Sequence, residues 1–467
     1  MPKLHQLWDN LRSSLWFVPS LIVLGAVALA IGLIETDART DPRVWERWPY
    51  LFGAGAAGAR GMLAAVASSM ITVAGTAFSV TIVALSLTSS QYTSRVLRNF
   101  MGDRVNQAVL GIFVGIFAYC LVVLRTIRGG DEGAFVPPLA VLGGVVLAFV
   151  GIGCLIFFVH HIATSIQAAN ILAAVSAETV SAIDRLFPEG LGEAGGERDT
   201  SPEGMPPRSW HPLPALSTGY IQGVDDSALL RFARDRGVVV RMERGIGEFV
   251  VQGTPLASLS GEAAPAEGDA RELAAAYVIG PQRTMVQDAA FGFRQIVDVA
   301  MKALSPGVND TTTAVMCVDR LTDLLVRAAR RQVERPRRMD GGELRVIARG
   351  PTFACLLAES FDQVRQNAGG NVAVLSRLLW AVGLLAGQVN GGRRAAVLRQ
   401  AEAVAEAARR SDLAPHDRDA LEACIAEAGR LLGAERLVAS RQGQSVPQSP
   451  TALPATDCAT AHEGATQ

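Results

Sequence analysis

The polar side chains that could bind a ligand are concentrated in residues 280–315 (GPQRTMVQDAAFGFRQIVDVAMKALSPGVNDTTTAV), which we call the signature stretch. Its candidate ligand-binding residues are Asp288, Arg294, Asp298, Lys302, Ser305, Asn309 and Asp310. A small anion could bind beside Asp310 at a helix N-terminus, where free backbone N–H groups point outward. A cation could instead bind to Asp288, Asp298 and Asp310. The third alternative is a buried polar network that fixes how two helices meet.

Catalysis has less support in the signature stretch. All six histidines lie outside it, so no Ser-His or Cys-His arrangement can be built from its residues. An acid/base pair of Lys302 and Asp298 is conceivable, but nothing else in the sequence supports it. The six cysteines are scattered without CxxC or other metal-ligand spacing. We therefore predict no catalytic residue, no metal site and no cofactor.

Two helices joined by a turn must position these residues. A Ser-Pro-Gly turn ends the first helix, and Asn309 or Asp310 caps the second. The pairs Arg294/Asp298 and Asp298/Lys302 are spaced i, i+4 and would each meet on the surface of the first helix. An apolar seam at three- and four-residue steps predicts that this helix packs on a neighbour: Val286, Ala290, Phe293, Val297, Ala300 and Leu304.

The first third of the chain has the composition of a membrane region. Hydrophobic residues make up 49% of the chain and the mean hydropathy is +0.27, high for a soluble protein. Four apolar runs approach the about 20 residues that a helix needs to cross a bilayer: residues 17–34, 62–87, 108–127 and 135–159. We predict that residues 1–160 form a multi-pass region in the bacterial cytoplasmic (inner) membrane. The even number of spans and the scattered, reduced cysteines favour N- and C-termini in the cytoplasm.

The second span carries a stripe of hydroxyl side chains. Its members follow one another by three, four or seven residues and therefore share one helix face: Ser68, Thr72, Thr76, Ser79 and Ser86. This hydroxyl stripe could line a pore for ions or a small solute. Alternatively, small and hydroxyl residues allow close packing of one helix on another. No Asp, Glu, Lys or Arg lies mid-span, so the usual mark of a proton relay is absent from the sequence.

The helical pattern continues beyond the fourth span. Residues 161–188 keep an apolar stripe and predict a cytoplasmic stalk. A helix over residues 138–187 would be roughly 75 Å long at 1.5 Å per residue, unless it kinks at Gly151 or Gly153. Such a projection favours assembly of several copies.

The soluble half divides by composition into five further segments. They are a linker at 189–215, a small β domain at 216–262, the signature helix-turn-helix at 270–335, a helical bundle at 350–434 and a disordered tail at 435–467. Within the β domain, GEFVVQGTPLASL resembles the barrel-sandwich hybrid of biotinyl and lipoyl carriers. The carrier's modified lysine is missing from the turn, so the resemblance implies a structural module without a swinging-arm cofactor.

Two blocks resemble a known family. They are FSVTIVALSLTSSQYTSRVLRNFMGDRVNQAVLGIFVGIFAYCLVVLR and IGPQRTMVQDAAFGFRQIVDVAMKALSPGVNDTTTAV. Both are similar to signatures of a bacterial family of predicted membrane proteins, catalogued as domain of unknown function number twenty-two fifty-four. The resemblance covers residues 11–432. Relatives usually have a proline and an aromatic residue where this chain has Thr311 and Thr312. The resemblance implies the topology and no activity.

The expected fold is a multidomain membrane protein. It has a four-helix transmembrane region, a long cytoplasmic stalk, a small β-barrel-like (barrel-sandwich-hybrid-like) domain and a C-terminal α-helical domain. The preferred function is a homo-oligomeric channel or transporter-like protein with a cytoplasmic regulatory domain. The alternative is a membrane-anchored scaffold or sensor that binds a cytoplasmic partner or small ligand. The net charge of −1 argues against nucleic acid as a partner. The expected partners are the lipid bilayer, other copies of the chain and an unknown cytoplasmic partner.

Overall fold

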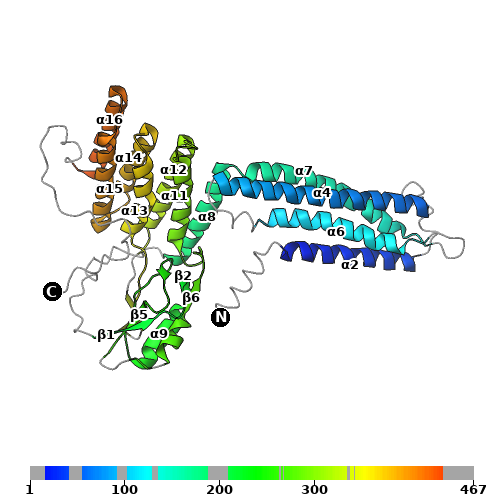
Figure 1. Cartoon of the computed structure of the whole chain (residues 1–467), viewed down its shortest axis with the longest axis horizontal. Coiled ribbons are helices and arrows are strands. Elements are labelled where there is room, and N and C mark those ends of the chain that lie inside the picture. Colours follow the sequence, from blue (N-terminus) through cyan, green and yellow to red (C-terminus); the bar gives the residue numbers. More distant parts are fainter. Residues whose placement is uncertain are drawn as a thin grey trace. The chain divides into compact units, whose positions relative to one another are not determined.

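The structure is a computed structural model of the 467-residue chain. It describes residues 16–40, 55–91, 103–128, 135–187, 209–261, 265–266, 268–333, 337–340 and 342–434. The predicted tail and most of the predicted linker lie outside these residues. The chain divides into two compact units, Met1–Ile171 and Leu172–Gln467, and each is considered by itself (Figure 1).

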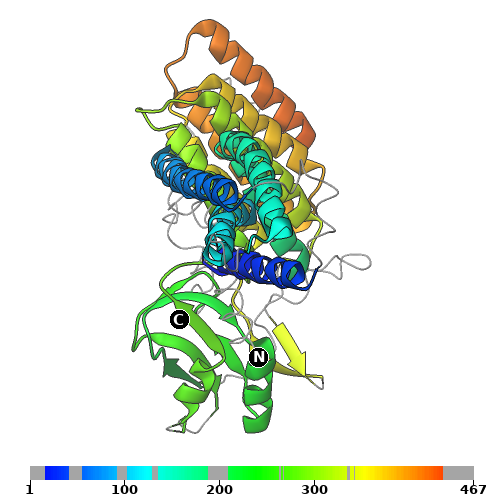
Figure 2. The same cartoon turned by 90° about the vertical axis from the view of Figure 1, so that its right-hand side faces the viewer.

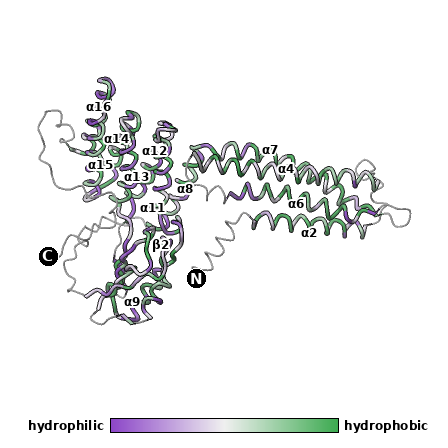
Figure 3. The backbone as a smooth tube through the Cα atoms, viewed as in Figure 1, coloured by the Kyte–Doolittle hydropathy of each residue, from purple (hydrophilic) through white to green (hydrophobic). Residues whose placement is uncertain are grey.

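Four helices of the first unit are long and apolar enough to cross a membrane. They are α2 (Phe17–Arg39), α4 (Ala56–Gln91), α6 (Arg104–Thr126) and α7 (Pro138–Ser165). Each overlaps one predicted span, so the prediction of four apolar helices is confirmed. Figure 3 shows their predominantly hydrophobic colouring. Helix α6 contacts the other three and is the centre of this unit.

Small residues let these helices approach one another closely. A Cβ atom at Gly111 of α6 would lie 2.8 Å from the Cα atom of Pro19 in α2. One at Gly151 of α7 would lie 2.9 Å from the Sδ atom of Met70 in α4. The first contact is with backbone, which cannot give way, so glycine is required at position 111. The second is with the flexible side chain of Met70, which the missing side chain of Gly151 allows to approach closely. Helix α4 turns a face rich in alanine toward its neighbours: Ala59, Leu63, Ala67, Met70, Ala74, Ala77 and Ala84 are buried.

Residues 138–187 do not form one continuous helix. Helix α7 ends at Ser165, and a separate helix, α8 (Ala168–Leu186), begins three residues later. The hydroxyl groups of Thr164 and Ser165 donate to the carbonyl of His161, and the Nδ2 atom of Asn170 donates to the carbonyl of Thr164. These side chains take over backbone acceptors at the break and stabilise it. Both glycines that were candidates for a kink lie inside α7.

The strands of the second unit form two sheets. The five-stranded sheet has the order β1-β5-β3-β8-β7, and the three-stranded sheet has the order β4-β2-β6. The strands are β1 (Trp210–Pro214), β2 (Gly219–Val224), β3 (Val240–Met242), β4 (Phe249–Val250), β5 (Pro255–Ser260), β6 (Tyr277–Gly280), β7 (Arg337–Asp340) and β8 (Glu343–Ile347). Two short helices, α9 (Asp226–Arg236) and α10 (Asp269–Ala274), complete this region.

The predicted β-barrel-like domain has no support, because neither sheet closes on itself among the described strands. Strand β1 begins at Trp210, inside the predicted linker, and pairs with β5. Strands β7 and β8 lie far beyond the predicted β domain, and β8 pairs in parallel with β3. The partners of the local hairpins are thus distant in sequence, which the pattern of residues 216–262 could not indicate.

Six helices form a stack of three hairpins. They are α11 (Ala289–Ala303), α12 (Thr311–Ala329), α13 (Phe353–Asn367), α14 (Val372–Ala386), α15 (Gly391–Arg410) and α16 (Pro415–Leu432). Helices α11, α13 and α15 form one layer, and α12, α14 and α16 form the other. The strands and α9 lie below this stack in Figures 1 and 2. The signature helices are therefore the first hairpin of the stack rather than a separate element beside a bundle.

Two arginines at the start of α15 join the hairpins at their ends. The Nη1 atom of Arg393 donates to the carbonyls of Ala329 and Arg331, just past the end of α12. Arg394 donates to the carbonyl of Ala386 at the end of α14 and to that of Leu432 at the end of α16. The three helices of one layer thus share their C-terminal caps, which also places positive charge where the helix dipoles favour it.

Candidate functional site

Asp288 stabilises the start of α11. Its Oδ1 atom accepts the backbone N–H of Phe291 at 3.1 Å, so Asp288 is the N-cap. The same carboxylate pairs with Arg283, with 2.8 Å between Nε and Oδ2 and 3.1 Å between Nη2 and Oδ1. The Asp288 side chain is 3% exposed, and a Cβ at Gly247 would overlap it. The turn that contains Gly247 (φ +84°) therefore covers this ion pair, and the geometry is that of a structural joint.

Gln287 joins the same helix to the three-stranded sheet. Its Oε1 atom accepts the N–H of Val224 at 2.8 Å, and its Nε2 atom donates to the carbonyl of Val224 at 3.2 Å. The register of β2 against β6 shifts between Ile221 and Gly223, directly before Val224. The side-chain amide of Gln287 thus forms hydrogen bonds with both the N–H and the carbonyl of Val224, beside a bulge that interrupts the regular strand ladder.

Arg294 and Asp298 form the predicted i, i+4 pair, with 2.8 Å between Nε and Oδ1. Arg294 also reaches Glu359 of α13, with 3.2 Å between Nη1 and Oε1. This three-residue network connects the first hairpin to the second. The predicted Asp298/Lys302 pair stays a prediction.

The turn from Ser305 to Asp310 holds its polar groups through local hydrogen bonds. The Ser305 hydroxyl donates to the carbonyl of Lys302, and Asn309 adopts a left-handed backbone conformation with φ 48°. Asp310 is the predicted cap of α12: its Oδ1 accepts the N–H of Thr313 and its Oδ2 the hydroxyl of the same residue. These bonds to Thr313 hold the pKa of Asp310 below its usual range.

The seven candidate residues do not converge on one site. Asp288 caps the start of α11, and Asp310 caps the start of α12. The 15 residues of α11 between them span roughly 22 Å at 1.5 Å per residue. No group of three or more His, Cys, Asp or Glu side chains arranged for a metal ion is found in the described part of the chain. The observed contacts of Asp288, Arg294, Ser305 and Asp310 join helix ends and neighbouring helices. The choice among the three alternatives stays a prediction. Ligand binding at any single position stays a prediction.

The hydroxyl stripe of α4 lies on the surface of the first unit. All five of its residues are exposed, and its threonines at 72 and 76 donate to the carbonyls of Ser68 and Thr72. Such back-bonding satisfies the hydroxyl donors without a neighbouring helix. A Cβ at Gly61 or Gly75 on α4 would meet nothing within 4 Å. Close packing within the chain therefore does not explain the stripe.

Two polar contacts of the first unit were missed by the sequence analysis. The Nε2 atom of His161 in α7 lies 2.6 Å from the Oδ2 atom of Asp103, the N-cap of α6. At the opposite ends of these helices, the buried Asp37 of α2 accepts the N–H groups of Leu139 and Ala140 at the start of α7. The prolines that begin α7 were a local signal of its start, but no local signal pointed to a cap from α2.

The comparisons with known proteins agree with this architecture. The model of a family described as "Predicted membrane protein (DUF2254)" matches residues 12–383. The chain belongs to this family. It is 36% identical over 421 residues to "Uncharacterized protein MT1328" of Mycobacterium tuberculosis (strain CDC 1551 / Oshkosh), covering 88% of this chain and 79% of that protein. It is 35% identical, with the same coverage, to "Uncharacterized protein Rv1290c" of M. tuberculosis (strain ATCC 25618 / H37Rv). No solved structure matches the chain.

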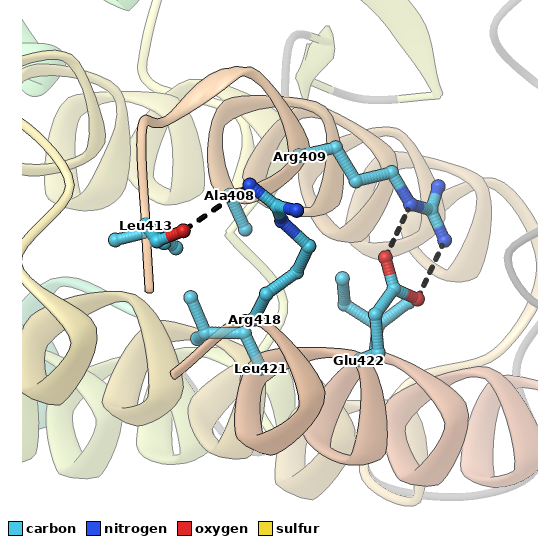
Figure 4. Close-up of a pocket in the computed structure, with 7 residues that line it drawn as sticks. Ala408, Arg409, Leu413, Arg418, Leu421 and Glu422 are labelled. Carbon is cyan, nitrogen blue, oxygen red and sulfur yellow. Dashed lines mark hydrogen bonds and ion pairs between the residues drawn. The ribbon is translucent and has the colours of Figure 1, made fainter. Parts of the chain in front are cut away.

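The DUF2254 match ends inside α14, so the third hairpin lies outside it. A small cavity of about 50 Å³ opens between α15 and α16 in this hairpin (Figure 4). Arg409 and Glu422 pair across it, with 3.0 Å between Nε and Oε1, and Arg418 donates to the carbonyl of Leu413. A volume of this size holds water molecules rather than a metabolite. The cavity is a feature of how the last two helices meet.

Proposed function

We propose that this DUF2254 protein is a homo-oligomeric channel or transporter-like protein of the bacterial inner membrane. In this proposal the hydroxyl stripe of α4 lines a path for a small solute between copies of the chain. The observation that carries the proposal is the exposure of the whole stripe on the surface of the first unit. The soluble unit would then act as a cytoplasmic regulatory domain.

The two faces of α4 are on opposite sides of the helix. At about 100° per residue, the centres of the buried alanine-rich face and of the hydroxyl stripe are roughly 180° apart. Exposed apolar residues flank the stripe on both sides, among them Ile71, Phe78 and Val80. A polar line between apolar margins is the pattern expected of a pore-lining helix whose margins contact neighbouring helices or lipid.

The length of the stripe fits a path across the bilayer. Ser68 and Ser86 are 18 residues apart, or roughly 27 Å along a helix, against about 30 Å for the hydrocarbon core. The one charged residue of α4 is Arg60, and its Nη2 atom donates to the carbonyl of Ile127 at 2.7 Å. The path would therefore be neutral, which favours small polar solutes or weakly selected monovalent ions over a proton relay.

Geometry favours a path that several copies of the chain surround together. A single helix cannot surround a path, and within the described residues the stripe faces no other helix of the chain. The glycines at 61 and 75 leave the backbone of α4 open to close approach by another helix. A second copy of α4 offers the same small side chains, as an isologous or ring-forming interface requires.

Labelling of single cysteines would test whether the stripe faces water. In a cysteine-free chain in liposomes, Thr72→Cys and Thr76→Cys should react with a membrane-impermeant maleimide. The control Phe78→Cys lies on the apolar margin and should react at least tenfold more slowly. Equal, slow labelling at all three positions would show that lipid covers the stripe.

A flux assay would test conduction itself. Purified protein in liposomes should release entrapped monovalent ions or a small polar solute, and Thr72→Phe should reduce that release at least tenfold because the ring fills the path. Ile71→Phe places the same ring one residue away on the margin and should leave the flux unchanged. Absence of flux for every common ion and solute at every pH would remove the channel proposal.

The orientation is proposed with both termini in the cytoplasm. Four candidate spans, an even number, support placing the two ends of the region on the same side. Maleimide applied from outside to intact cells should not reach a single cysteine introduced at Asn309, in an exposed turn of the soluble unit. Rapid labelling from outside would reverse the orientation.

A second candidate function is a scaffold or sensor that binds a cytoplasmic partner. It is favoured by exposed apolar side chains on the second layer of the hairpin stack: Trp380, Leu384 and Leu431. Stacked hairpins form extended surfaces that commonly bind other chains. Crosslinking in native membranes followed by purification should then yield a stoichiometric partner that Trp380→Ala releases. Purification of the chain alone, with unchanged flux in the variant, would count against this role.

A further inference from the structure

Helix α8 is held tightly by the signature stretch. A Cβ at Gly292 of α11 would overlap the side chain of Thr179 in α8, with 2.7 Å to Cγ2 and 2.8 Å to Cβ. Thr179 is fully buried, and its hydroxyl donates to the carbonyl of Val175 within its own helix. Because even the Cβ of Thr179 is too close, a rotamer change cannot make room for a side chain at position 292. Glycine at this position therefore sets the closest approach of α8 to α11.

Charged side chains fasten the far end of α8. The Nη2 atom of Arg185 donates to the carbonyl of Val286 at 2.7 Å, just before α11 begins. Arg331, which follows α12, pairs with Asp184 at 2.7 Å and donates to the carbonyl of Phe187 at 3.0 Å. Both arms of the first hairpin thus bind the same turn of α8, and the Arg331 side chain is largely buried.

The connection from α8 back to α7 is much weaker. Ile166 and Gln167 lie outside both helices, and the side-chain bonds that stabilise this break join residues at most six apart. Ile166 itself packs against the apolar core of the first unit, on the α7 side of the break. One turn before this break, His161 ties α7 to Asp103 at the start of α6. The break is therefore flanked by one helix fixed to the hairpin stack and one fixed to the membrane unit.

We propose that α8 and the α11–α12 hairpin move as one rigid body and that Ile166–Gln167 is its hinge. Through this hinge, a conformational change of the soluble unit reaches α7 and, by the His161–Asp103 contact, α6. The signature stretch then acts as the coupling element of the protein. The rigid body stands on the contacts above, and only its effect on a solute path rests on the proposed function.

Hydrogen exchange on the full-length protein in lipid nanodiscs would test the rigid body without any transport measurement. In the wild type, backbone amides of α8 from Leu172 on should exchange as slowly as those of α11. Gly292→Ala should speed exchange in α8 at least tenfold while α13 to α16 keep their protection. The matched control is Gly383→Ala, where the new Cβ would lie 3.0 Å from the terminal Cδ1 of Leu431 and at an ordinary contact distance, 3.8 Å, from the Cα of Ala428. It should leave α8 unchanged.

A double variant distinguishes loss of the packing of α8 on α11 from general unfolding of the soluble unit. Thr179→Ala removes Oγ1 and Cγ2, so combining it with Gly292→Ala should return part of the α8 protection, a coupling that independent effects would not show. If Gly292→Ala unfolds the whole unit, Arg185→Gln tests the same docking of α8, because it removes the hydrogen bond to Val286 without introducing a clash. Unchanged α8 protection in both Gly292→Ala and Arg185→Gln would overturn the proposal.

The hinge has its own test. Insertion of two glycines after Gln167 should leave exchange in α8 and α11 as in the wild type. In liposomes, this insertion and Gly292→Ala should change the flux in the same direction by at least fivefold. A wild-type protein without flux would defeat the proposed channel and leave the exchange result standing. Normal flux that neither variant changes would defeat the coupling and leave the channel standing.

Discussion

The membrane unit and the hairpin stack both pack helix on helix, but with different residues. In the membrane unit, Gly111 lets the backbones of α6 and α2 approach closely, and alanines fill most of the buried face of α4. Large side chains are fully buried in both, among them Phe113 of α6 and Phe293 and Phe361 of the stack. Polar caps and ion pairs then fix the ends of the stacked helices. The difference follows from the solvent: lipid gives little drive to bury apolar area, so close backbone contact must stabilise the bundle.

The same contrast exists between two sets of glycines inside the membrane unit. Those of α6 and the inner face of α7 have no room for a Cβ, whereas Gly75 of α4 and Gly153 of α7 have open space around them. The first set is explained by packing within the chain. The open set marks surfaces that no described part of the chain covers, and on α4 it accompanies the hydroxyl stripe.

The largest effect should come from filling an inner glycine. In Gly111→Leu, even the new Cβ would lie 2.8 Å from the backbone of Pro19, so α2 must move away from α6. Overpacking of this kind costs about 3 kcal/mol or more where backbone blocks the site. The denaturation midpoint in a detergent titration, followed by circular dichroism, should fall strongly. Gly153→Leu is the matched control on the same unit and should leave the midpoint unchanged.

A similar test on the hairpin stack uses its polar joints. Asp288→Ala removes the cap of α11 and leaves Arg283 without its partner beneath a covering turn, which should cost about 2–3 kcal/mol. The exposed pair Arg327–Asp323, with 3.9 Å between its charged atoms, is the comparison. Asp323→Ala should cost less than about 0.5 kcal/mol because solvent screens that pair. Urea denaturation of the full chain, followed by fluorescence, would measure both, and equal losses would contradict the structural role of Asp288.

The sequence predicted features that depend on neighbours along the chain. Apolar runs gave the four membrane helices, the spacing of Arg294 and Asp298 gave their ion pair, and the residue order at Asp310 gave the cap of α12. Features made by distant segments escaped it. Gly292 has no local reason to be glycine, and only the approach of Thr179 from 113 positions earlier explains it. The open sheets were missed for the same reason, since strands find partners far away in the sequence.

The smallest expected effect is the difference in stability between a charged helix cap and a neutral one. Asp310 caps α12 and Asn371 caps α14, and the Nδ2 atom of Asn371 also donates to the hydroxyl of Thr311, so the two caps are neighbours. Replacing either by alanine at pH 7 should cost about 1 kcal/mol of stability.

The two caps should differ in their dependence on pH. The folded-state pKa of Asp310 is lowered by its bonds to Thr313, so its contribution is complete above the pKa of an unfolded aspartate, about 3.9, and is lost as the pH falls through the folded value. The penalty of Asp310→Ala should therefore shrink below about pH 4. The penalty of Asn371→Ala should stay constant because an amide does not titrate. Urea midpoints at pH 7 and pH 3 would measure this, and Asp310→Asn should behave as Asn371 does. A penalty for Asp310→Ala that is equal at both pH values would show that the carboxylate charge contributes nothing to the cap.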